Sequence, residues 1–140
     1  MSEDYTVGVR VEGFSNKHLH MTIAYVGKCN DEKLEKIKTA LQNLHDDVFP
    51  LHVTFTKDAM FGPKNDIPVR LCTVPEKAND KLVDFYKSFG VPDNNHVTEQ
   101  VLHVSKRNSE EEINKSSGFI SRTIFLKRIG PYDPIFDINC

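Results

Sequence analysis

Four of the six histidines are followed, two positions later, by a serine or a threonine: His20-Met21-Thr22, His52-Val53-Thr54, His96-Val97-Thr98 and His103-Val104-Ser105. On a β-strand, residues two apart project from the same face, so an imidazole and a hydroxyl would stand side by side. A single triplet is a weak signal, because chance alone gives about one in a chain of this composition. The context of each triplet therefore decides between them.

Two such triplets carry the groups that phosphodiester transfer needs. Histidine has an unperturbed pKa of about 6.5, so near neutral pH one imidazole can serve as base and another as acid. The hydroxyls can donate hydrogen bonds to nonbridging phosphate oxygens, and a cation can neutralise the charge that builds on them. This chemistry requires no metal, and we expect neither a metal ion nor another cofactor.

The first and last triplets have the most suitable contexts, because each lies in a predicted strand. The strands cover residues 18–26 and 101–107. Alternation puts the polar side chains of each strand on one face, namely His20 with Thr22, and His103 with Ser105 and Arg107. Two such strands facing a common cleft would bring together two imidazoles, two hydroxyls and one guanidinium.

The other two triplets are weaker candidates. His96 stands in a polar loop and is followed by Glu99, so a phosphate there would meet an anion. His52 alternates with apolar residues in a predicted strand but is followed by the polar run Thr56-Lys57-Asp58. A solvated sheet face is the expected place for His52, with a contact at the cleft edge as the alternative.

Further side chains could line a cleft around the favoured triplets. His18 shares the strand face of His20, whereas Lys106 is expected on the other face of its own strand, in solvent. Two loop aromatics could stack on a nucleobase or could instead fill the core: Phe61 and Tyr132.

The surrounding pattern predicts an α+β domain. Alternating residues indicate strands, and apolar residues at three- and four-residue steps indicate amphipathic helices. The expected order is strand 5–12, strand 18–26, a helix capped by Asn30 or Asp31, strands 51–56 and 69–74, a helix from Pro75, strand 101–107, a short helix at 109–112, and strand 120–129. Strand pairs interleaved with helices favour antiparallel pairing.

The chain length and the net charge limit the kinds of partner that we expect the protein to bind. The 140 residues suit one domain spanning 1–140, and a net charge of −2 gives no field that would gather long nucleic acid. No leader-like segment and no run of about 18 apolar residues occurs, so we expect a cytoplasmic protein without membrane contact. The three cysteines follow no metal-binding spacing and are predicted to be free thiols. We expect a monomer that acts on a small nucleotide or oligonucleotide.

The segment from His18 to Gly27 resembles the first motif of the 2H phosphoesterases, which include LigT-like 2′-5′ RNA ligases and cyclic phosphodiesterases. The segment from Val101 to Arg107 is similar to the second motif, although it uses Ser for Thr, lacks a Pro before its His and places its basic residue early. The element order is similar over nearly the whole chain.

This resemblance implies a two-lobed, pseudo-symmetric fold, with antiparallel sheets lining a central cleft and helices outside. It implies a phosphodiesterase acting on 2′,5′-linked oligonucleotides, cyclic dinucleotides or cyclic phosphates. Some compact members, several of them viral, degrade second messengers of antiviral defence, so a role in immune evasion follows by analogy. The implied catalytic residues are His20, Thr22, His103 and Ser105. The residue pattern itself adds the expected substrate contacts Arg107, His18, Phe61 and Tyr132, with a role in strand pairing as the alternative for His18.

Two other functions remain open from the residues. One is a noncatalytic nucleotide-binding or RNA-binding module that keeps the cleft without turnover. The other is a metal-dependent hydrolase built on the six histidines, although few carboxylates stand near them in the sequence.

Overall fold

The strands and helices alternate along the chain in the α+β order that the sequence predicts. The computed structural model describes residues 4–62, 64–91, 102–106, 108–130 and 134–139. In chain order the elements are β1 (Asp4–Arg10), β2 (His20–Lys28), α1 (Asp31–Val48), β3 (Leu51–Phe61), β4 (Ile67–Thr73), α2 (Glu76–Phe89), β5 (His103–Ser105), α3 (Glu110–Asn114), β6 (Gly118–Ser121), β7 (Thr123–Arg128) and β8 (Phe136–Asn139).

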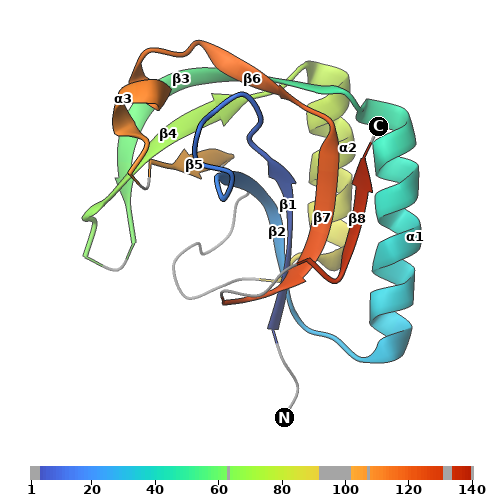
Figure 1. Cartoon of the computed structure of the whole chain (residues 1–140). Coiled ribbons are helices and arrows are strands. Elements are labelled where there is room, and N and C mark those ends of the chain that lie inside the picture. Colours follow the sequence, from blue (N-terminus) through green and yellow to red (C-terminus); the bar gives the residue numbers. More distant parts are fainter. Residues whose placement is uncertain (1–3, 63, 92–101, 107, 131–133, 140) are drawn as a thin grey trace.

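The strands form one antiparallel sheet in the order β6-β3-β4-β5-β2-β1-β7-β8. The sheet is strongly curled, as Figure 1 shows. The strands of the two favoured triplets, β2 and β5, meet at its centre, with three further strands beyond each of them. The predicted α+β class with antiparallel pairing is therefore confirmed, and the strands of both halves belong to a single continuous sheet.

One face of the sheet is apolar because its strands alternate. In β1, Val7 and Val9 are fully buried and pair with Leu126 and Ile124 of β7, which are also fully buried. The other face of β1 carries Thr6, Gly8 and Arg10. This alternation fixes the register, since a slip of one residue would expose the apolar set.

Two long helices cover the apolar face and lie side by side (Figure 1). Asn30 caps α1, as expected, by accepting a hydrogen bond of 2.8 Å from the Lys33 N–H. Each helix buries one stripe of apolar residues: Ile37, Leu41 and Leu44 of α1, and Ala78, Leu82 and Phe85 of α2. Among the described residues, no helix is long and apolar enough to cross a membrane.

The strands differ from the predictions in several details. The predicted strand 120–129 is interrupted at Arg122, where the chain passes from β6, which pairs with β3, to β7, which pairs with β1. The strand β8 was not predicted, because it is short, contains Asp137 and begins two residues after Pro134. Strand β2 begins at His20 and continues through Gly27, whose φ of 68° accommodates an irregularity in the register with β1.

Two of the three cysteines, Cys29 and Cys72, are free thiols as predicted, and Cys140 lies outside the described residues. Burial raises the pKa of the Cys72 thiol to about 12, so this group stays protonated at neutral pH. Cys72 therefore serves as a small apolar residue.

Leu41→Ala tests the role of α1 in the core. Leu41 is fully buried, so the substitution should lower the free energy of unfolding by about 2–5 kcal/mol. Urea denaturation, monitored by circular dichroism, measures this change. Lys36→Ala, on the exposed side of the same helix, is the control and should cost less than about 0.5 kcal/mol. Equal losses in the two variants would contradict the packing.

Candidate active site

The centre of the sheet brings the first and last triplets together. Met21 of β2 pairs directly with Val104 of β5, and both side chains are fully buried. Met21 and Val104 are the middle residues of their triplets. The outer residues of both triplets therefore project from the opposite face of the sheet, away from the core.

The same register sets the four polar side chains beside one another. Continued by one residue in each direction, it places His20 next to Ser105 and Thr22 next to His103. Side chains in such pairs have Cβ atoms about 4.5–5.5 Å apart. All four residues are half-buried. The structure thus unites the residues predicted to be catalytic: His20, Thr22, His103 and Ser105.

His20 is oriented by its own strand and by β7. Its Nδ1 lies 3.2 Å from the main-chain oxygen of His18, a contact that favours a proton on Nδ1 and a lone pair on Nε2. The ring also makes an edge contact with Phe125, with centroids 6.1 Å apart. The side chain of His18, predicted to contact substrate, is exposed just before β2.

His103 is flanked by Phe61, whose ring lies edge-on at a centroid distance of 4.5 Å. Phe61 was expected in a loop but is the last residue of β3, where it pairs with Ile67 of β4. The hairpin of β3 and β4 therefore carries Phe61 to the second triplet, and this predicted substrate contact lies at the site.

Sequence reasoning missed two residues at the first triplet, Arg10 and Phe125. Arg10 pairs directly with His20 across β1 and β2, and its guanidinium lies over the Phe125 ring at 5.6 Å from the centroid. Gly8 makes room for this ring, since a Cβ there would lie 2.9 Å from Phe125 Cζ. The alternation of β1 placed Arg10 on the polar face, but it could not show which strand lies alongside.

Lys106, expected in solvent, is only 6% exposed. Its Nζ lies 2.9 Å from Asp58 Oδ1, and Arg70 Nη1 lies 2.7 Å from the same oxygen. These hydrogen bonds, first from Lys106 and then from Arg70, hold the pKa of Asp58 below its ordinary value. The three charges tie β5 to β3 and β4, directly beside Ser105.

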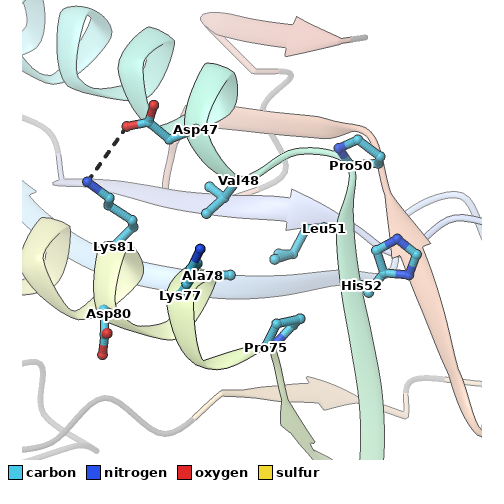
Figure 2. A pocket seen from close by; sticks show the side chains of 10 residues that line it. All are labelled: Asp47, Val48, Pro50, Leu51, His52, Pro75, Lys77, Ala78, Asp80 and Lys81. Atoms are coloured by element: carbon cyan, nitrogen blue, oxygen red, sulfur yellow. Dashed lines mark ion pairs between the residues drawn. The ribbon is translucent and has the colours of Figure 1, made fainter.

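Of the other residues that the sequence singled out, His52 is placed away from this group, and three are not described by the structure. Arg107, Tyr132 and His96 lie outside the described residues. His52 is exposed as expected, and it lines a separate pocket of about 450 Å³ between α1, β3 and α2. Figure 2 shows this pocket, which is floored by apolar side chains and crossed by an ion pair between Lys81 and Asp47. In the described part of the chain, no three His, Cys, Asp or Glu side chains gather as metal ligands would.

Comparison with known proteins agrees with the geometry. A family model described as LigT like Phosphoesterase matches residues 2–70, which include the first triplet. The crystal structure of E. coli LigT complexed with NADP⁺ superposes with a TM-score of 0.50 at 11% identity, covering 99% of this chain and 98% of that one. No match was found among curated proteins.

The sequence match over residues 2–70 and the fold shared with E. coli LigT support the resemblance to the 2H phosphoesterase superfamily. The match to this family model supports an activity of the phosphodiesterase type in general terms.

Gly8→Ala tests the contact between Phe125 and His20. The added methyl would lie 2.9 Å from Phe125 Cζ and 3.0 Å from the Met21 carbonyl oxygen, so the ring must move. We expect a loss of roughly 1–3 kcal/mol in the free energy of unfolding and a shift of the His20 imidazole signals in NMR spectra. Unchanged His20 signals in a destabilised variant would contradict the role assigned to Gly8.

Asp58→Asn tests the charge cluster through pH. The folded-state pKa of Asp58 lies below the ordinary 3.8, so its carboxylate stabilises the fold above that value, and the contribution is lost as pH falls through the folded pKa. At neutral pH the variant should unfold at a lower urea concentration than wild type. This difference in urea concentration should disappear below about pH 4. Urea denaturation between about pH 7 and pH 3 measures this.

The control is Asp84→Asn, on an exposed position of α2. It removes the same charge without touching Lys106 or Arg70. Two results would show that the cluster contributes nothing through its charge. Asp58→Asn could unfold at the same urea concentration as wild type at neutral pH, or the difference between the two could persist unchanged into acid.

Proposed function

We propose that the protein is a metal-independent phosphodiesterase that cleaves a small nucleotide phosphodiester by acid–base catalysis with two histidines. One observation carries this proposal: the Met21–Val104 pair sets both triplets on one face of adjacent strands. Two imidazoles and two hydroxyls then surround a space where a single phosphate can be held.

In the proposed reaction, one imidazole takes a proton from the attacking hydroxyl and the other gives a proton to the leaving oxygen. Thr22 and Ser105 donate hydrogen bonds to the nonbridging oxygens, where charge develops. With a 2′,5′ linkage, the free 3′-hydroxyl attacks the phosphorus, and the bond between phosphorus and the 5′ oxygen breaks. The products are a 2′,3′-cyclic phosphate and a 5′-hydroxyl. With a cyclic phosphate, water attacks and the ring opens.

Several features support a small nucleotide as substrate. The net charge of −2 gives long nucleic acid little attraction. E. coli LigT, which shares the fold, was crystallised with the dinucleotide NADP⁺. The proposal includes action as a cytoplasmic monomer. Cleavage of 2′,5′-oligoadenylate or a cyclic dinucleotide would point to the removal of an antiviral second messenger.

The test is a cleavage assay, in chelator, on 2′,5′-oligoadenylate, cyclic dinucleotides and 2′,3′-cyclic nucleotides. Wild type should cut one of these classes, and His20→Ala and His103→Ala should each lower kcat/KM by roughly 10²–10⁴-fold. The matched control is His52→Ala, which removes the histidine of an exposed triplet of the same kind and should retain activity. The pH profile of kcat/KM should be bell-shaped, because one imidazole must be neutral and the other protonated.

The outcomes separate the alternatives. Binding of these nucleotides without cleavage by wild type would favour a noncatalytic module. Activity that disappears in chelator and returns with added metal would favour a metal-dependent hydrolase. Cleavage that survives both histidine substitutions would rule out the two-histidine mechanism.

A further inference from the structure

Arg10 lies where it can extend the proposed site by one phosphate. It is the direct neighbour of His20 on β1, on the side of β2 away from β5. The four polar side chains of the triplets are centred between β2 and β5. Strands in a sheet are about 4.8 Å apart, so Arg10 stands about 7 Å from that centre.

The guanidinium is held in place by apolar packing. It lies over the face of Phe125, and that ring, 3% exposed, is fixed above Gly8 and against His20. A cation stacked on a ring keeps its N–H groups directed outward in the plane of the guanidinium. The side chain is therefore oriented before any ligand binds.

No acidic side chain neutralises Arg10 among the residues that the structure describes. Asp137 of β8 pairs with Phe125 on the same face, but it is exposed and forms no ion pair with Arg10. Lys127, two residues beyond Phe125, adds a second positive charge to this face. A half-buried guanidinium beside a nucleotide site is suited to bind phosphate oxygens in pairs.

We propose that Arg10 binds a second, nonreacting phosphate of the substrate, one nucleoside away from the phosphate whose cleavage the two histidines catalyse. This inference rests on the proposed function and narrows its substrate class. The site selects nucleotides with at least two phosphates, such as 2′,5′-linked oligonucleotides or cyclic dinucleotides. Nucleoside 2′,3′-cyclic monophosphates leave Arg10 without a partner and are poorer substrates.

The test uses 2′,5′-linked diadenylate in three forms: without a terminal phosphate, with a 5′-phosphate, and with a phosphate on the other terminal ribose. The two phosphorylated forms offer the second phosphate on either side of the scissile one. Cleavage rates and equilibrium dissociation constants are measured for wild type, Arg10→Gln and Arg10→Lys. Lys36→Gln removes the same charge from the exposed face of α1 and serves as control.

Wild type should prefer at least one doubly phosphorylated form, in Kd and in kcat/KM, by roughly 10-fold or more. Arg10→Gln should bring this preference ratio close to one, and Arg10→Lys should retain part of it, because a point charge replaces the planar fork. Lys36→Gln should keep the wild-type ratio.

The inference is overturned if wild type shows no preference, if the preference survives in Arg10→Gln, or if Arg10→Gln weakens all three forms equally. The last result would mean that Arg10 only supports the fold or the scissile phosphate. Binding that prefers two phosphates through Arg10, without any cleavage, would support the inference while refuting the proposed activity. The two failures are therefore distinguishable.

Discussion

The site depends on the pairing of β2 with β5 through Met21 and Val104. Burial of these two side chains in the core fixes the register, and the register alone brings His20, Thr22, His103 and Ser105 together. A shift of one residue in either strand would turn its imidazole into the core. The requirement to bury two apolar side chains therefore also positions the polar groups on the other face, although neither buried residue takes part in the chemistry.

The two histidines have different surroundings, although their triplets are alike. His20 adjoins an aromatic ring and a guanidinium from β7 and β1, whereas His103 adjoins Phe61 from the β3–β4 hairpin. Beneath the second triplet, Asp58 joins two cations on the core side of the sheet. The two triplets therefore lie on adjacent strands but have surroundings that differ in charge.

The sequence predicted the features that depend on residues close together in the chain. Strand alternation placed His20 with Thr22 and His103 with Ser105, and periodicity located both long helices. It could not predict Arg10 and Phe125 as neighbours of His20, because cross-strand register is set by residues far apart in the chain. The sequence also could not predict that Lys106 is buried. A β-bulge in β3 between Phe55 and Asp58 turns the Asp58 carboxylate to the core side, where it meets Lys106, and alternation alone assigns it to the other face.

The central position of the β2–β5 junction bears on how the chain folds. Its two strands come from opposite ends of the sequence, and each is joined on its other side to a different half of the sheet. Contacts between residues so far apart in the sequence require the chain to lose conformational entropy as a long loop closes. Such contacts tend to form late in folding. Neither strand alone carries both triplets, so the proposed catalysis requires this long-range pairing to be formed. The proposed activity would then be a direct measure of the fully folded population.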